Sequence, residues 1–346
     1  MKIALLAPFE EPVPPVKYGG TELVVFNLAE ELVKMGHDVT LLASGDSHTS
    51  AKLVVCAPAA IRTLKSARNQ KTRVALNYQG LARAIEVING GNFDIIHNHF
   101  GWQPLLFENT IDCPMVTTLH GTLVDPTEKL MHDQYRDSAF ISISDSQRRH
   151  GPNLNYIATV YNGINVKSFS FNDKPGEYLA FLGRICPEKG PTYAIEIAKK
   201  TNQRLIIAAK VDPVDEDFFE EFVEPLIDGD QIIFIGEVDH EAKVKMLKNA
   251  TALLSPLQWD EPFGLANIEA MACGTPVIAI NRGSMKELII NDKTGYLCSN
   301  IDEMIDQVPR IGRIDRVACR QHVMENFNSK LMAKRYLEAY GQLMGD

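Results

Sequence analysis

The sequence predicts an α/β protein made of two doubly wound parallel sheets. Short apolar runs, suited to buried strands, alternate with helix-like segments through both halves of the chain. Loops rich in glycine or polar residues follow several of these runs, as they do in nucleotide-binding βαβ units. The length of 346 residues allows two domains of ordinary size.

Composition narrows the class of protein. Apolar residues make up 45% of the chain and charged residues 23%, as in an ordinary globular protein. The net charge of −9 argues against a nucleic-acid partner. The six cysteines form no Cys-x-x-Cys pair, which favours reduced thiols over disulfides or a zinc site. The sequence has no run of about 18 apolar residues that could span a membrane. Its first residues predict a strand rather than a signal peptide, so we expect a cytoplasmic protein.

The first half opens with a strand, a glycine-containing loop, a helix and a second strand. Apolar runs at residues 2–7 and 39–43 predict two central strands of a parallel sheet. The proline-rich loop between them ends in Gly19 and Gly20, and we expect Thr21 to cap the helix that follows. A Gly-Gly pair is often only a turn, but it also allows close approach of the backbone to a phosphate or a sugar.

Histidines stand at the ends of two further strands of this half. The strand expected at residues 94–99 carries His97 and His99, and the strand at 115–119 is followed by His120. Ligands of parallel sheets bind at the carboxyl ends of the strands. A metal site is one interpretation, but no carboxylate is placed with the histidines and no helical His-x-x-x-His pattern is present. For His97 and His99, ordinary hydrogen-bonded side chains are the favoured interpretation.

Two basic residues flank a strand-to-helix loop at the start of the second half. The strand expected at residues 178–182 leads into Arg184, and Lys189 precedes a helix that begins at Pro191. Isolated cations in loops are usually solvated. The planar fork of an arginine beside the point charge of a lysine also suits two phosphates.

Two glutamates stand eight residues apart in the segment 261–274. Glu261 falls in a loop, and Glu269 falls on a helix expected at residues 265–273 and ended by Gly274. Backbone N–H groups at the start of this helix suit a diphosphate. The two carboxylates could accept hydrogen bonds from hydroxyl groups on either side of that diphosphate, or they could be ordinary solvated acids.

Several of these segments resemble motifs of the family 4 retaining glycosyltransferases. Glu261-Pro-Phe-Gly-Leu, with Glu269 and the following Ala-Met-Ala-Cys-Gly-Thr-Pro-Val, is similar to the donor-site motif of the family. Gly-Arg-x4-Lys-Gly from Gly183 resembles its diphosphate clamp. Gly-Gly-Thr-Glu from Gly19 resembles its glycine loop, and Thr-Leu-His-Gly around His120 resembles its strand-end histidine motif.

The resemblance implies the GT-B fold, in which two doubly wound, Rossmann-like domains face each other across a cleft. We expect an N-terminal, acceptor-side domain at residues 1–168 and a nucleotide-sugar donor domain at residues 169–326. A C-terminal helix, at about residues 327–346, would cross back to the first domain. The crossing segment resembles that of the family, with Asn165 where an Asp is usual, and residues 169–177 read as a polar linker.

The resemblance also implies a role for each candidate residue. Arg184 and Lys189 would bind the diphosphate, and Glu261 would bind hydroxyl groups of the sugar. His120 would contact the sugar from the other domain, and Glu269 would hold the ribose hydroxyls. The remaining donor-binding positions are Gly19, Gly20, Val238, Phe263, Gly264, Leu265 and Ala266.

The implied function is transfer of a sugar from a nucleotide-diphosphate sugar to an acceptor hydroxyl, with retention at the anomeric carbon. For the donor we expect a UDP-sugar first, with guanosine and adenosine diphosphate sugars as alternatives, and the acceptor could be a sugar, a small metabolite or a lipid-linked glycan. A nucleotide-sugar 2-epimerase on the same fold and a non-catalytic nucleotide-sugar binder are the alternatives. A basic segment at residues 57–73 could meet an anionic acceptor or a membrane surface, although a solvated helix face is the favoured interpretation.

We expect no metal ion and no other cofactor. Asp215 and Asp217 form an Asp-x-Asp pattern, which holds a metal in the other major glycosyltransferase fold. Here the pattern begins an amphipathic helix that carries Phe218 and Phe222, and acids in a first helical turn are usually solvated. Arg184 and Lys189 would supply the positive charge instead.

Overall fold

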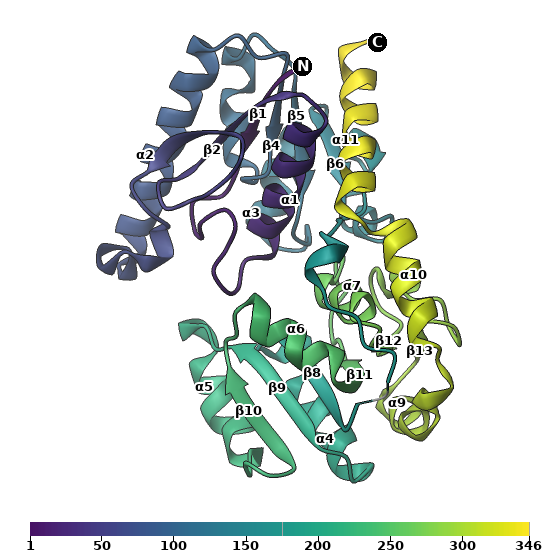
Figure 1. Ribbon diagram of the computed structural model, residues 1–346. Coiled ribbons are helices and arrows are strands. Elements are labelled where there is room, and N and C mark those ends of the chain that lie inside the picture. Colours follow the sequence, from purple (N-terminus) through teal and green to yellow (C-terminus); the bar gives the residue numbers. More distant parts are fainter. Residues whose placement is uncertain (175, 346) are drawn as a thin grey trace. The chain divides into compact units, whose positions relative to one another are not determined.

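The structure is a computed structural model that describes residues 1–174 and 176–345. The chain forms two compact units, one of Met1–Ile164 with Ser329–Asp346 and one of Asn165–Asn328 (Figure 1). The expected linker and the expected C-terminal helix each include one position, 175 and 346, that lies outside the described residues. Each unit is built around its own parallel sheet.

In the described part of the first unit, seven parallel strands form one sheet in the order β3-β2-β1-β4-β5-β6-β7. Its strands are β1 (Lys2–Leu6), β2 (Asp38–Ser44), β3 (Lys52–Ala57), β4 (Ile95–Asn98), β5 (Met115–Leu119), β6 (Ala139–Ser142) and β7 (Tyr156–Thr159). Chain order reverses between β1 and β4. Ligands of doubly wound sheets bind beyond the carboxyl ends of the strands at such a reversal.

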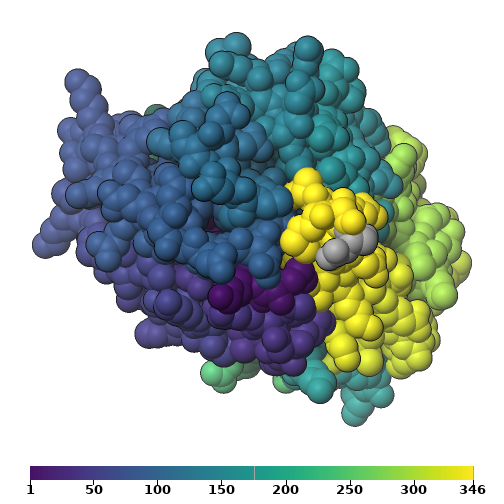
Figure 2. Space-filling model, turned by 90° about the horizontal axis from the view of Figure 1, so that it is seen from above, coloured from purple at the N-terminus to yellow at the C-terminus, as the bar shows by residue number. Residues whose placement is uncertain are grey.

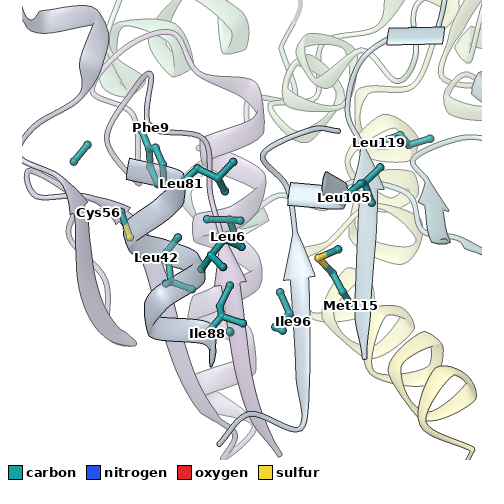
Figure 3. Packing of buried hydrophobic residues seen from close by; sticks show 14 of the residues in the cluster. Leu6, Phe9, Leu42, Cys56, Leu81, Ile88, Ile96, Leu105, Met115 and Leu119 are labelled. Atoms are coloured by element: carbon teal, nitrogen blue, oxygen red, sulfur yellow. The ribbon is translucent and has the colours of Figure 1, made fainter. Parts of the chain in front are cut away.

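The helices of this unit complete its core. They are α1 (Gly20–Lys34), α2 (Gln70–Gly90), α3 (Pro126–Gln134) and the C-terminal α11 (Ser329–Met344). Leu6, Leu42 and Ile96 from three neighbouring strands pack with Leu81 and Ile88 of α2 (Figure 3). The C-terminal helix packs against α1 and β7. Its last turn lies at the surface beside the N-terminus, in yellow and purple in Figure 2.

The start of α1 differs from the prediction, because Thr21 is not its N-cap. Gly19, with a φ of 153°, is the N-cap, and no described side chain caps the helix. A Cβ at Gly19 would come within 2.6 Å of the Cβ of Pro15, so the packing of the proline-rich loop requires glycine there. The helix therefore begins before Thr21, which lies inside its first turn.

In the described part of the second unit, six parallel strands form a sheet in the order β10-β9-β8-β11-β12-β13. Its strands are β8 (Tyr178–Arg184), β9 (Leu205–Lys210), β10 (Ile232–Gly236), β11 (Ala250–Ser255), β12 (Val277–Ile280) and β13 (Gly295–Cys298). Its helices are α4 (Pro191–Lys200), α5 (Glu216–Phe218), α6 (His240–Lys248), α7 (Leu265–Ala272), α8 (Met285–Leu288), α9 (Ile301–Gln307) and α10 (Arg316–Asn326). Chain order reverses between β8 and β11.

The amphipathic helix expected from Asp215 is not a regular α-helix. Only Glu216–Phe218 is α-helical, and a π turn at Phe219–Val223 and a 3₁₀ turn at Glu224–Leu226 follow. Pro225 has no N–H to donate to the preceding turn, so an α-helix cannot continue through it. No helix among the described residues is long and apolar enough to span a bilayer.

Candidate active site

An ion pair joins the loops after β8 and β11, the two strands at the reversal of the second sheet. Lys189 Nζ donates to Glu261 Oε2, and Trp259 Nε1 donates to the same oxygen over 3.0 Å. The ammonium of Lys189 also lies 5.1 Å from the centre of the Trp259 ring. Glu261 is buried and therefore not the solvated loop acid of the alternative interpretation.

One backbone hydrogen bond and two close approaches at glycines join these loops. Gly190 has a φ of 70°, and a Cβ there would come within 2.3 Å of the carbonyl oxygen of Pro256. The N–H of Gln258 donates to the carbonyl of Glu188 over 2.8 Å. A Cβ at Gly283, in the loop after β12, would come within 2.3 Å of the backbone nitrogen of Glu261. Glycine is therefore required where the loops after β8 and β12 touch the segment of Glu261.

The predicted anion-binding helix is α7. Gly264 is its N-cap with a φ of 91°, and Gly264, Leu265 and Ala266 are all half-buried rather than fully covered. Phe263 is different, because only 2% of it is exposed and its ring packs edge-on to Phe327. A ligand would therefore meet the backbone of Phe263 and not its side chain.

Glu269 is buried on α7 and forms an ion pair with a lysine of α6. Lys243 Nζ lies 2.5 Å from Glu269 Oε1. The same ammonium lies 5.7 Å from the centre of the Phe169 ring. Val238, the candidate contact of the nucleobase, is half-buried in the turn between β10 and α6, the helix that carries Lys243. Glu269 is thus not a solvated helix residue.

Arg184, the last residue of β8, lies beside Asp215, which was expected to be solvated. Its Nε lies 3.3 Å from Asp215 Oδ2, and the carboxyl group of Asp215 is largely buried. Burial raises the pKa of Asp215, although the guanidinium of Arg184 opposes this shift. The expectation that Asp215 is solvated was wrong, because the turn before α5 folds back onto the end of β8. Asp217, by contrast, is exposed.

In the first unit, the predicted residues also lie at the carboxyl ends of the strands. Gly19 and Gly20 follow β1, and His120 follows β5. His120 Nε2 lies 2.8 Å from His99 Nδ1, and burial lowers the pKa of His120 to about 4. His97 contacts Tyr340 and Thr118 through its two ring nitrogens, so it has no nitrogen left for a metal ion. The metal interpretation of the three histidines therefore has no support in this geometry.

The glycine loop contains a carboxyl group that the sequence analysis did not single out. Glu22, in the first turn of α1, is only 6% exposed. Burial is the main cause that raises its pKa to about 7, and the nearby Glu11 adds to the shift. Its Oε2 would lie 3.2 Å from a Cβ at Gly19, so the carboxyl group folds back over the glycine pair.

The basic segment at residues 57–73 is partly neutralised by the proline-rich loop. Arg62 pairs with Glu11 at 2.8 Å, and Arg73 binds both carboxylate oxygens of Glu10 at 3.1 and 2.9 Å. These ion pairs attach the segment to the loop that precedes Gly19.

Among the described residues, no group of three histidine, cysteine, aspartate or glutamate side chains is arranged to hold a metal ion.

Two family models match the chain along most of its length. The model described as Glycosyltransferase Family 4 matches residues 18–168, and the model described as Glycosyl transferases group 1 matches residues 165–311. This chain is a family 4, group 1 glycosyltransferase. The resemblance drawn from the donor-site motifs is thereby confirmed.

Curated relatives of this glycosyltransferase span nearly its whole length. It is 25% identical to the phosphatidyl-myo-inositol mannosyltransferase of Mycolicibacterium smegmatis, over 100% of this chain and 95% of the relative. It is 24% identical to the glycogen synthase of Mycobacterium tuberculosis, over 94% of this chain and 92% of the relative. The relatives therefore support glycosyltransferase activity.

Solved structures show that the glycosyltransferase has the GT-B fold. Sucrose-phosphate synthase from Thermosynechococcus elongatus matches with a TM-score of 0.80 and 22% identity, over 100% of this chain and 99% of that one. The Anabaena protein Alr3699/HepE, solved in complex with UDP and glucose, matches with a TM-score of 0.77 and 17% identity, over 99% and 100% of the two chains. The expected α/β fold of two doubly wound sheets is confirmed.

The partners of the glycosyltransferase's charged residues were not predicted from the sequence. Trp259 stands two positions before Glu261, and this spacing could have indicated a contact. No sequence spacing indicated the contacts of Lys243 with Glu269 or of Asp215 with Arg184. Each pair is far apart in the sequence and meets only in the folded chain.

Proposed function

We propose that this glycosyltransferase moves a sugar from a nucleoside diphosphate sugar to an acceptor hydroxyl, with retention at the anomeric carbon and without a metal ion. The observation that carries the proposal is the grouping of Arg184, Lys189 and Glu261 with the start of α7 at the reversal between β8 and β11. A doubly wound sheet binds its ligand at this place.

The donor diphosphate is assigned to the two cations and to the start of α7. Arg184 and Lys189 provide a fork and a point charge, and the half-buried backbone at Leu265 and Ala266 provides N–H groups at the positive end of a helix. Glu269 takes the ribose hydroxyls. The Anabaena structure was solved with UDP and glucose, which supports a UDP-sugar as the donor class.

The chemistry requires stabilisation of the leaving group. As the bond from the anomeric carbon to the diphosphate oxygen breaks, negative charge grows on the diphosphate, and preorganised cations lower the energy of that state. Glu261 is already paired with Lys189 and Trp259, so we assign it to the hydroxyl groups of the sugar rather than to nucleophilic attack. The leaving phosphate takes the proton of the acceptor hydroxyl.

The first unit supplies the proposed contacts of the transferred sugar and of the acceptor. His120 is neutral at pH 7, because burial lowers its pKa to about 4, so it offers hydrogen bonds and no charge. Gly19 and Gly20 let the backbone approach the ligand. The acceptor is a sugar, a small metabolite or a lipid-linked glycan; relatives are named as enzymes of glycogen and of phosphatidyl-myo-inositol.

A reducing compartment fits the thiols of the enzyme. All six cysteines lie within the described residues and are free. Free buried thiols are typical of cytosolic proteins, and this supports the proposal that the enzyme acts in the cytoplasm.

A thermal-shift screen of nucleoside diphosphates, followed by product analysis, tests the proposal. A ligand at 100 times its Kd adds about 2.7 kcal/mol to the stability of the folded protein. We expect UDP or another nucleoside diphosphate to stabilise the wild-type enzyme and Glu269→Gln to abolish most of the shift. NMR of the product made with an acceptor panel should show the anomeric configuration of the donor. An inverted product, or a new nucleotide sugar formed without acceptor, would contradict the proposal.

A further inference from the structure

A chain of hydrogen bonds connects the C-terminal helix to the histidines of the first sheet. His97 Nδ1 lies 2.6 Å from the hydroxyl of Tyr340, and its Nε2 lies 2.7 Å from Thr118 Oγ1. Thr118 Oγ1 in turn donates to the hydroxyl of Tyr336 over 3.3 Å. Because Thr118 uses its proton on Tyr336, it accepts from His97, whose proton is therefore on Nε2. Tyr340, whose pKa is raised far above its usual value by burial, donates to His97 Nδ1.

A second contact joins His99 to His120. His99 Nδ1 and His120 Nε2 are 2.8 Å apart, so one of them carries the proton and the other accepts it. Burial lowers the pKa of both histidines, so each ring is neutral at pH 7 and carries one proton. The two rings together carry two protons on four nitrogens. Of the two nitrogens in contact, only one can be protonated.

The other nitrogen of His99 decides between the two arrangements. His99 Nε2 is buried and has no hydrogen-bond partner among the described residues. Buried N–H groups without an acceptor are rarer in proteins than buried acceptors without a donor. The proton of His99 is therefore on Nδ1, where it is donated to His120 Nε2, and not on Nε2, where nothing would accept it.

We infer that His99 fixes His120 as the Nδ1–H tautomer, so that His120 presents a hydrogen-bond donor to the bound ligand. His99 is then a positioning residue, because it acts on the ligand only through His120. The half-buried His120 offers its Nδ1–H to a lone pair, such as that of a sugar hydroxyl, and cannot accept a proton from a hydroxyl at that atom.

The C-terminal helix supports this arrangement through His97. The rings of His97 and His99 lie 3.9 Å apart between centroids. His97 is held at both nitrogens, by Tyr340 of α11 and by Thr118 of β5, so it provides a fixed surface against which His99 packs. The orientation of His99, and through it the tautomer of His120, thus depends on a helix more than 200 positions away in the sequence.

NMR of protein labelled with ¹⁵N-histidine tests the tautomer directly, without any ligand. Long-range ¹H–¹⁵N correlations distinguish Nδ1–H from Nε2–H rings, and the spectrum of His120→Gln assigns the His120 signals. We expect Nδ1–H for His120 in the wild type. His99→Asn keeps a donor at the place of Nδ1 and should keep both this tautomer and the ¹⁵N shift of His120 Nε2. In His99→Leu, of similar size, His120 Nε2 loses its donor, so its ¹⁵N shift should move to that of an acceptor nitrogen without a hydrogen bond. An Nε2–H ring in the wild type would overturn the inference.

An unchanged ¹⁵N shift of His120 Nε2 in His99→Leu would also overturn the inference. If His99→Leu does not fold, the wild type and His99→Asn still decide the assignment.

Activity gives a second readout, which rests on the proposed function. His99→Leu should lower kcat about three- to tenfold, the effect of one neutral hydrogen bond, with the donor KM little changed, and His99→Asn should restore most of kcat. A changed ¹⁵N shift of His120 Nε2 with unchanged kcat would remove His120 from the proposed sugar site and leave the tautomer assignment intact. Failure of the tautomer assignment and failure of the proposed function can therefore be distinguished.

Discussion

Lys189 and Glu261 form a partly buried ion pair although 72 positions separate them in the chain. They meet because β8 and β11 are neighbours in the sheet and their loops leave its carboxyl edge side by side. In the proposed mechanism, Lys189 serves the diphosphate and Glu261 serves the sugar. The ion pair makes these two functions interdependent, since a change in one residue alters the charge around the other.

The first prediction concerns this coupling. Lys189→Met should lower kcat about 10²–10³-fold, because it removes one preorganised charge from the leaving group. Glu261→Gln should also lower kcat, and the double variant should lose far less than the product of the two single effects. Steady-state kinetics of the four proteins measures this, with the exposed Lys286→Met as a control. Strictly multiplicative losses would show that the two residues act independently.

The second prediction concerns the ribose. Glu269→Gln should weaken binding of a nucleoside diphosphate about 10- to 150-fold, because hydrogen bonds to a charged acceptor are lost. Lys243→Met should weaken this binding as well, because the buried carboxylate of Glu269 would lose its partner. Calorimetry with the 2′,3′-dideoxy analogue is the control, since it has no hydroxyls for Glu269 to bind. If the variants also bind this analogue less tightly than the wild type, the ribose assignment is wrong.

The third prediction concerns metal ions. Turnover should survive exhaustive EDTA treatment, because Arg184 and Lys189 supply the positive charge. Asp217→Asn should have no effect, since Asp217 is exposed, whereas Asp215→Asn should change kcat by a few-fold, because Arg184 loses a neighbouring carboxylate. Both variants should remain insensitive to EDTA. If activity is lost with EDTA, restored by Mg²⁺ or Mn²⁺, and abolished in Asp215→Asn, a metal ion rather than Arg184 and Lys189 supplies the positive charge.

The fourth prediction concerns stability and pH. The pKa of Glu22 is raised from 4.5 to about 7, chiefly by burial. Between these values the folded carboxyl keeps its proton while the unfolded one releases it, so the free energy of unfolding falls as pH rises, by about 3 kcal/mol in total. Glu22→Gln should remove this contribution to the fall of the free energy of unfolding with pH. Urea unfolding at pH 5 and pH 8 measures it.

An exposed glutamate of α2 provides the control for this experiment. Glu86→Gln should keep the pH dependence of the wild type. A Glu22→Gln protein with the same decline as the wild type would show that Glu22 is ionised at neutral pH in the folded state.

Local sequence was enough to predict the elements that carry the site. Apolar runs and glycine stops placed β8 and α7 almost as the structure has them, and Glu269 falls on α7 as expected. These signals depend on residues only a few positions apart, as hydrophobic periodicity and helix termination do. The cap expected at Thr21 was wrong: Gly19 is the N-cap of α1, and Pro15 lies so close to it that a Cβ would not fit there.

The partners of the charged and titratable groups were decided only by the tertiary structure. Lys243 reaches Glu269 across 26 positions, and His99 reaches His120 across 21. Parallel strands need long crossover connections, so residues that meet at the carboxyl edge of a sheet are distant in sequence. Burial, which lowers the pKa of His120 and raises that of Glu22, likewise depends on which elements pack around a side chain. The sequence by itself therefore determined the family, the fold class and the candidate residues, whereas folding determined their partners and protonation, because both depend on contacts between distant segments.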